Sequence, residues 1–131
     1  MIEVKRTERG WAGHFICALR CRFRRNTLLE AGDTRIVVSS VGLMDNLPGK
    51  GDNPGFTTIG HNRHFETMAF HAKHDGRYWD ANVSRGEISF NSEWVISDSD
   101  ADDRANDMHE AVVREFVDRL ASGETFPTDR D

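Results

Sequence analysis

The sequence predicts an α+β fold: an antiparallel sheet of about six strands with one long C-terminal helix packed on it. Alternating apolar and polar residues indicate strands in residues 1–96, and glycine-containing turns separate these segments. Apolar residues three or four positions apart indicate a helix in the last third. Because the strands come first and the helix last, an antiparallel sheet is favoured over alternating β and α units.

The first elements are a short strand within residues 2–6 and a turn around Gly10 and Gly13. The clearest alternation follows, with apolar side chains at every second position: Phe15, Cys17, Leu19, Cys21 and Phe23. Successive side chains of a strand point to opposite faces, so we expect a half-buried strand that ends near Asn26. Arg20, Arg22 and Arg24 would then form a row on one face at intervals of about 7 Å, with Arg25 on the other face.

Turn residues divide the middle of the chain. The sequence AGD joins two apolar runs, 27–30 and 35–40, into a predicted hairpin. Residues 43–60 are rich in glycine and proline and predict a long loop. Residues 65–73 predict a strand, the Asp-Gly turn at 74–76 leads back through 77–83, and residues 88–96 predict the last strand.

The helix is predicted at about residues 100–121. Its apolar stripe steps by three or four positions through Ala101, Ala105, Met108, Val112, Phe116 and Leu120. Ser99 suits the N-cap and Gly123 suits the position where a helix stops. We expect residues 123–131 to form a loose tail.

Length and composition predict one domain, residues 1–131, large enough for its own core. No run of eighteen apolar residues exists and the chain start lacks an apolar leader, so we expect a cytoplasmic protein away from the membrane. Cys17 and Cys21 would lie about 13 Å apart on a strand, too far for a disulfide, which predicts buried free thiols.

The net charge of −5 is unevenly distributed. Residues 1–35 carry eight Lys/Arg and four Asp/Glu, whereas residues 97–131 carry four Lys/Arg and eleven Asp/Glu. A net-acidic protein is a poor general nucleic-acid binder, because such binding needs many phosphate contacts. Two explanations stay open: the two ends attract each other within the fold or across a dimer, or the basic end holds a small anion.

The arginine row has the chemistry of an anion site, since guanidinium groups make forked, charge-assisted hydrogen bonds to phosphate. A solvated strand face, or salt bridges to the acidic helix, would explain the same residues. Trp11, Tyr78, Phe90 and Trp94 lie beside turns and strand ends, where they could stack on a base or simply pack.

Metal and catalytic chemistry find less support. His61 and His64, and likewise His71 and His74, are three positions apart, but no nearby acidic or cysteine set completes a metal shell, so we expect no metal site. Common nucleophile, phosphate-loop and zinc-protease motifs are missing, and Ser39 and Ser40 have no recognisable partner. A triad built from residues far apart in the sequence stays open.

Residues 8–42 resemble the phage Thoeris anti-defence proteins of the first-described type, through RGWAGHFICALRCRFRRNTLLE and RIVVSSVG. Residues 61–121 are similar in layout, and residues 43–60 have no counterpart. The resemblance implies an antiparallel sheet with a long helix, a homodimer or hexamer of dimers, and a non-enzymatic role without a cofactor. It implies that the protein sequesters a cyclic ADP-ribose isomer made by bacterial TIR-domain immune proteins; some members also hold cyclic oligonucleotides.

The resemblance also implies a set of ligand-binding residues. Arg24 and Arg25 would clamp the diphosphate at the strand end, with Arg22 in the same row. Arg114 from the helix and an aromatic residue, Phe90 or Tyr78, would enclose the adenine. Asn91 would contribute from the neighbouring subunit.

Two other function classes stay open. One is a small metal-dependent phosphodiesterase or nuclease that uses the histidines as ligands. The other is a phage inhibitor that acts by protein–protein contact, with the acidic helix imitating nucleic acid. The acidic last third of the chain favours the contact inhibitor, whereas the arginine row favours the sequestering protein.

Overall fold

The computed structural model describes residues 2–10, 14, 21–45, 56–57, 59, 64–74, 76–93 and 101–126. Its elements are β1 (Lys5–Glu8), β2 (Cys21–Ala31), β3 (Thr34–Asp45), β4 (Phe56–Thr57), β5 (Phe65–His74), β6 (Trp79–Ala81), the 3-10 turn η2 (Val83–Arg85), β7 (Glu87–Glu93) and α1 (Ala101–Ala121). Strands followed by one long helix confirm the predicted α+β class.

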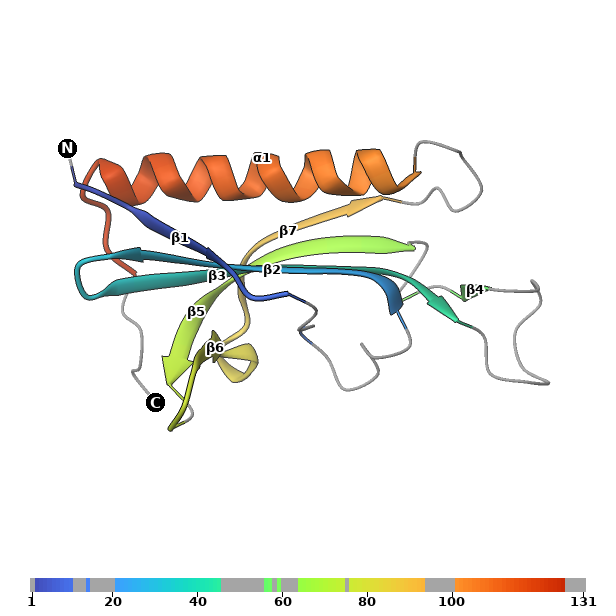
Figure 1. The fold of residues 1–131 in the computed structure, drawn as a ribbon, viewed down its shortest axis with the longest axis horizontal. Helices are drawn as coiled ribbons and strands as arrows, with labels where there is room; N and C mark the ends of the chain where they lie inside the picture. The colour runs from blue at the N-terminus through green and yellow to red at the C-terminus, as the bar shows by residue number, and fades with distance from the viewer. Residues whose placement is uncertain are drawn as a thin grey trace.

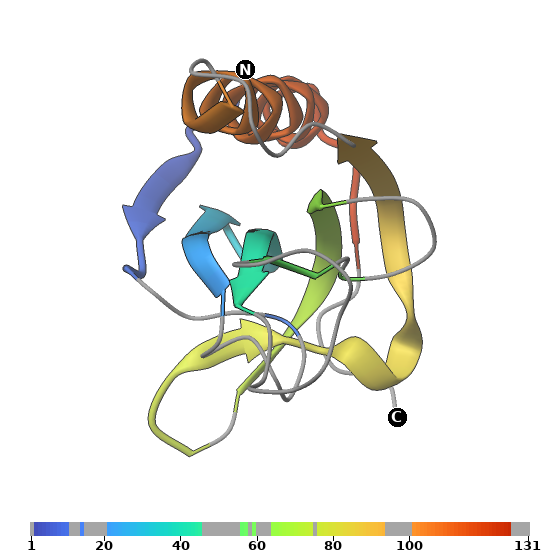
Figure 2. The same cartoon turned by 90° about the vertical axis from the view of Figure 1, so that its right-hand side faces the viewer.

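Every strand pair in the sheet is antiparallel. The strand order is β1-β2-β3-β5-β6, with β4 added to β3 and β7 added to β5. The sheet is strongly curved, and α1 runs along one of its faces (Figure 1). Seen along the helix, β1 and β7 stand at the two sides beneath α1, and β6 lies beyond the opposite face (Figure 2).

The hairpin of β2 and β3 forms the centre of the sheet. Its turn contains Gly32 with a φ of 60°, as the sequence AGD predicts. The predicted break near Asn26 is wrong, because β2 continues through Asn26 and Thr27, which pair with Ser39 and Val38. Both polar side chains are fully buried and hydrogen-bonded, so the ladder passes through them without interruption.

The predicted loop 43–60 is shorter than expected at both ends. Residues 43–45 belong to β3, and β4 pairs with the end of β3 through residues 56–57. Most of the remaining segment lies outside the described residues.

The second half of the sheet follows the predicted order. Gly76 has a φ of 99° in the expected turn after β5. The return strand β6 covers only Trp79–Ala81, so Tyr78 precedes the strand rather than lying in it. The last strand begins at Glu87, with a register shift opposite Ala69 and Phe70, and the predicted residues 94–96 lie outside the described part.

Helix α1 packs most of its predicted stripe on the sheet, but Met108 is only half-buried, and the next residue, His109, is buried although it was not predicted. Its buried side chains are Ala101, Ala105, His109, Val112, Val113, Phe116 and Leu120. The helix ends as predicted at Gly123, whose φ is 97°. The Gly123 amide donates to Leu120 and the Glu124 amide to Arg119, the two hydrogen bonds of a Schellman motif. Ser99, the predicted N-cap, lies outside the described residues.

The predicted loose tail is wrong for its first residues. Phe126 is 6% exposed and joins the main core, where it contacts the rings of Phe116 and His71. Residues 127–131 lie outside the described part.

The sheet is also covered on the face away from the helix. Leu28, Val37 and Ala72 form an apolar cluster there, against which Trp79 and Ala81 of β6 pack. This cluster holds β6 against the sheet and so positions the surface described below. Cys21 is buried and forms no disulfide, as predicted, while Cys17 lies outside the described residues. None of the described helices has both the length and the apolar character to cross a membrane.

Candidate functional site

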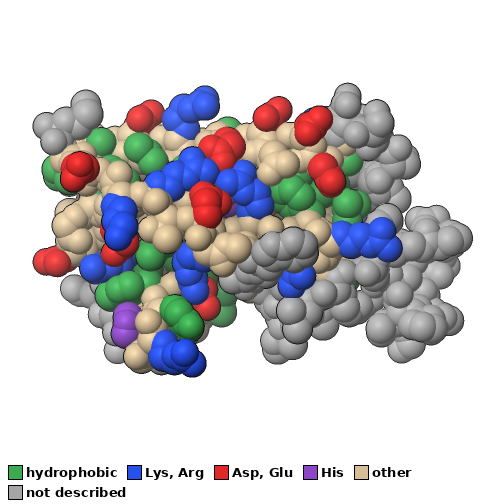
Figure 3. Space-filling view, in the orientation of Figure 1, with side chains coloured by type: hydrophobic (Ala, Val, Ile, Leu, Met, Phe, Trp, Pro, Cys, Tyr) green, Lys and Arg blue, Asp and Glu red, His purple; other side chains and the backbone are tan. Residues whose placement is uncertain are grey.

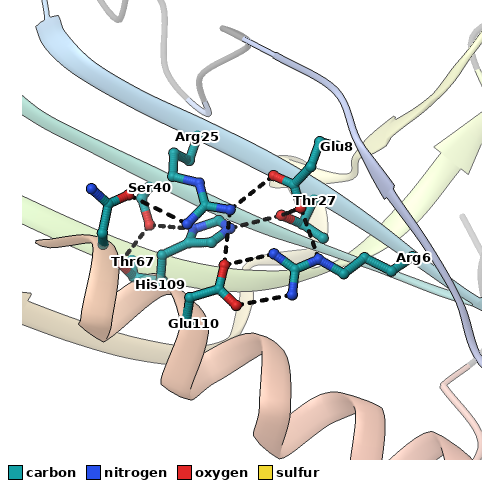
Figure 4. Close-up of polar contacts among 9 residues, drawn as sticks. Arg6, Glu8, Arg25, Thr27, Ser40, Thr67, His109 and Glu110 are labelled. Atoms are coloured by element: carbon teal, nitrogen blue, oxygen red, sulfur yellow. Dashed lines mark hydrogen bonds and ion pairs between the residues drawn. The ribbon is translucent and has the colours of Figure 1, made fainter.

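Four charged side chains join β1, β2 and α1 on the helix side of the sheet: Arg6, Glu8, Arg25 and Glu110, here called the charged seam (Figure 4). Arg6 donates to both carboxylate oxygens of Glu110, at 2.9 and 2.6 Å. Arg25 donates to Glu8 at 2.9 Å and contacts Glu110 at 2.9 Å. Basic and acidic groups alternate over α1 and β1 (Figure 3).

The seam favours charged carboxylates. Hydrogen bonds from Arg6 and then Arg25 lower the pKa of Glu110 to about 2 despite partial burial. Burial alone would raise the pKa of Glu8, but hydrogen bonds from Arg25, Arg6 and Thr27 outweigh it and leave that pKa below its usual value. Basic residues near the chain start thus bind acidic residues of the last third, which supports the explanation that the two ends attract each other within the fold.

Arg25 is therefore a structural cation rather than an open clamp. The predicted end of the strand near Asn26 does not exist, and Arg25 faces the helix, with Glu8, Glu110 and Asn106 as its partners. Arg24 occupies the next position and so lies on the other face of β2, while Arg22 is exposed. Arg20 lies outside the described residues.

Arg114 is exposed on α1, one turn after Glu110. It lines a cavity of about 260 Å³ with Arg6, Glu110, Val113 and Val117. Of the predicted arginines, Arg25 and Arg114 thus share Glu110 as a neighbour. Phe90 and Asn91 are exposed on β7 at the other side of the sheet, so a single chain does not bring them to these arginines.

A second hollow lies on the face of the sheet away from α1. It has a volume of about 350 Å³ and is lined by Thr7, Arg9, Leu28, Tyr78 and Trp79; we call it the aromatic hollow. Leu28 and Trp79 belong to the apolar cluster that holds β6, so their side of the hollow is fixed by packing. Tyr78, by contrast, is 54% exposed. Hydrophobic side chains lie beside Lys and Arg in the lower left of Figure 3, under the sheet.

One guanidinium group, that of Arg9, lines the aromatic hollow, and two others contact the aromatic rings that line it. Arg35 lies over the ring of Trp79 at 4.2 Å, and Arg77 lies 5.4 Å from the ring centre of Tyr78. Arg9 lines the hollow itself and donates to Asp80 at 3.0 Å. Glu30 partly neutralises Arg35 at 3.0 Å. Basic and acidic side chains thus lie together beside the two aromatic rings.

This arrangement suits a planar anion. The aromatic rings and Leu28 offer an apolar surface for a ring system, and arginines offer charge-assisted donors to phosphate. Tyr78 is the predicted ligand residue that lies here. Sequence reasoning missed Arg9, Arg35 and Trp79 as site residues. The adjacent pair Tyr78-Trp79 after an Asp-Gly turn was a usable indication, but nothing local connects it to Arg9.

The sequence showed no recognisable partner for Ser39 or Ser40, but the structure gives each of them a histidine partner. The His14 ring bonds Ser39 at 2.9 Å on one side and Glu66 on the other. Ser40 bonds His109 at 2.7 Å on the opposite face of β3, and also bonds Thr67. Ser39 is 0% and Ser40 is 1% exposed, so neither hydroxyl is open to a substrate. Both side chains are part of the packed interior.

The candidate metal histidines are dispersed. His64 is buried, His71 contacts Phe126, and His74 is exposed against the edge of Trp79, while His61 lies outside the described residues. Within the described ranges, no three His, Cys, Asp or Glu side chains are placed to share an ion.

Comparison with known proteins adds no further identification. No protein-family model, no curated protein and no solved structure matches this chain. The likeness to Thoeris anti-defence proteins therefore stays a prediction from the residues.

Proposed function

We propose that this protein sequesters a small nucleotide signal without cleaving it, and that the aromatic hollow is where the ligand binds. The observation that carries the proposal is one cavity lined by Arg9, Tyr78 and Trp79. The guanidinium groups of Arg35 and Arg77 lie against the rings of Trp79 and Tyr78, respectively. A ring system stacks on the aromatic residues and a phosphate group meets the guanidinium groups. Affinity then comes from donors that the fold holds in place before binding.

The family resemblance supplies the biological part of the proposal. The ligand is a cyclic ADP-ribose isomer made by a TIR-domain immune protein, and its capture in the bacterial cytoplasm blocks Thoeris signalling. Assembly as a homodimer or a hexamer of dimers belongs to the same proposal. In such an assembly, Asn91 and Phe90 on β7 of one copy would reach the site of another.

The test measures the chemical fate of a bound nucleotide. The purified protein is incubated with cyclic ADP-ribose, its isomers and cyclic dinucleotides, freed of unbound ligand and then heated. Mass spectrometry identifies what is released. We expect one compound to be recovered unchanged from the wild type.

Two aromatic variants locate the site. Tyr78→Ala removes the exposed ring of the aromatic hollow, and Phe90→Ala removes the exposed ring on β7. We expect Tyr78→Ala to lower retention of the ligand about fivefold or more, since loss of one stacked base costs about 1–3 kcal/mol. Phe90→Ala should lower retention less than Tyr78→Ala does; loss in the Phe90 variant alone would move the site to β7.

Other results point to the other function classes. A chemically altered nucleotide, formed only with a divalent metal, would replace sequestration by a phosphodiesterase. No retained nucleotide, together with a stable complex with a host protein, would favour an inhibitor that acts through its acidic helix.

A further inference from the structure

Arg9 forms hydrogen bonds with two strands, β2 and β6, at the edge of the aromatic hollow. It follows β1, and its backbone amide donates to the Asn26 carbonyl at 2.7 Å. Its Nη1 donates to Asn26 Oδ1 at 3.3 Å and to Asp80 Oδ1 at 3.0 Å. The Arg9 side chain is only 17% exposed, so its position is defined by these three contacts.

Asp80 is fixed where it meets Arg9. Its Oδ1 also accepts the backbone amide of Ala81 at 2.8 Å, so the carboxylate is tied to β6. Asp80 directly follows Trp79, which lines the hollow. Its side chain is 45% exposed. A negative charge therefore lies directly against Arg9, the guanidinium group that lines the hollow.

We propose that Asp80 is a positioning residue that competes with an anionic ligand for Arg9 and so sets both the affinity and the charge selectivity of the aromatic hollow. This inference rests on the proposed function of that hollow. A phosphate group that binds Arg9 must replace or share the Asp80 carboxylate, whereas a neutral nucleoside leaves that ion pair intact. Asp80 therefore weakens the binding of phosphates more than it weakens the binding of weakly charged compounds of similar shape.

Two opposite effects of Asp80 have to be weighed. Its hydrogen bond helps to hold Arg9 in place, which favours binding, whereas its charge repels and competes with phosphate. Two other hydrogen bonds also hold Arg9 in place: its backbone amide donates to the Asn26 carbonyl, and its Nη1 donates to Asn26 Oδ1. Asn26 is 0% exposed, which fixes its oxygen against Arg9. Competition therefore exceeds the loss of positioning when the Asp80 charge is removed.

The experiment removes the charge and keeps the shape. Asp80→Asn retains an oxygen that can accept the Ala81 amide. Calorimetry at low and at 0.5 M salt measures binding of cyclic ADP-ribose as the anionic probe and adenosine as the neutral one. We expect Asp80→Asn to tighten cyclic ADP-ribose binding about three- to tenfold and to leave adenosine unchanged, as fits a half-exposed ion pair. The gain should shrink at high salt.

A second background tests whether Asp80 acts through Arg9. In Arg9→Met, the gain from Asp80→Asn should disappear; a gain that persists there would overturn the competition for Arg9. Asp80→Ala repeats the measurement, and urea unfolding confirms that each variant is folded. Equal or weaker binding of cyclic ADP-ribose by both Asp80 variants would also overturn the inference. If neither the wild type nor any Asp80 variant binds a probe, the proposed function itself fails.

Discussion

His109 of α1 lies entirely inside the molecule, with a hydroxyl partner on each ring nitrogen. Thr27 donates its proton to Glu8, so Thr27 must accept from the Nε2–H of His109. Nδ1 then accepts from Ser40 (Figure 4). This chain satisfies a neutral ring at both nitrogens. Burial, and next the charge of Arg25, lower the pKa of His109 to about 4.

Stability should therefore depend on the protonation of His109. Its pKa is about 4 in the folded protein and about 6.5 in the unfolded chain, so between these values the unfolded chain binds more protons. Stability should fall as the pH falls from 6.5 to 4, by about 3 kcal/mol at most from this residue. Urea unfolding at pH 7, 6, 5 and 4 measures the loss.

A matched variant isolates the histidine. His109→Gln retains a polar side chain that does not titrate, so the difference in stability between wild type and variant should narrow from pH 7 to pH 4. A constant difference would contradict the assignment. Further loss below pH 4.5 belongs to Glu8 and Glu110, whose lowered pKa values place their protonation in that lower range.

At the scale of elements, β3 packs so closely against β5 that no side chain fits at Gly42. Gly42 pairs with Phe65, and a methyl group at Gly42 would overlap the Phe65 ring. Phe65 is fully buried and meets Phe23 edge to face at 5.7 Å, so the ring has no free space to enter. The glycine is required here for close packing rather than for an unusual backbone angle.

Gly42→Ala should destabilise the protein by about 1–3 kcal/mol, the usual range for overpacking. Chemical unfolding measures the change. Phe65→Leu in the same chain should recover part of the loss, because the smaller side chain makes room and the two substitutions are in contact. If the stability losses of Gly42→Ala and Phe65→Leu simply add in the double variant, overlap with the Phe65 ring is not the cause of the Gly42→Ala destabilisation.

β1 and β7, which each pair with one neighbouring strand, differ in the features that affect pairing with another chain. β1 carries Lys5, Arg6 and Glu8, and exposed charges discourage the addition of another strand. β7 instead contains a register shift next to its pairing with Ala69 and Phe70, and such irregularities interrupt a regular edge.

At the scale of the whole molecule, the charged seam fastens the chain start to the helix. Arg6 and Glu110 are 104 positions apart and meet through two parallel hydrogen bonds. The Ile2 amide donates to the Ala121 carbonyl, so the same chain end is also tied to the end of the helix. The uneven charge of the sequence thus has a structural use within one chain.

A double-mutant cycle with Arg6→Met and Glu110→Gln measures that fastening. Their side chains are 36% and 38% exposed, so we expect a coupling energy of only about 0.5–1 kcal/mol, reduced in 0.5 M salt. A cycle with Arg25→Met and Glu110→Gln is the matched comparison, since Arg25 is 23% exposed and should lose less coupling to salt. Equal salt sensitivity would show that exposure does not control these pairs.

The sequence by itself determined the fold class, the order of the elements and the limits of the helix. Helix α1 begins within about one residue of its predicted start and stops at Gly123, and the Gly32 turn lies where predicted. These features depend on local periodicity and backbone preference, which neighbouring residues carry. The predicted break at Asn26 was wrong because its polar side chain finds buried partners from other elements.

Only the tertiary structure decided which arginines are available and where the candidate site lies. Arg25 looked open in the sequence but meets Glu8 and Glu110, and Arg9 meets Asp80, 71 positions away. The aromatic hollow forms where the end of β1, the middle of β2 and the start of β6 come together. Contacts between such distant segments depend on sheet register and curvature, and no local pattern of residues specifies them.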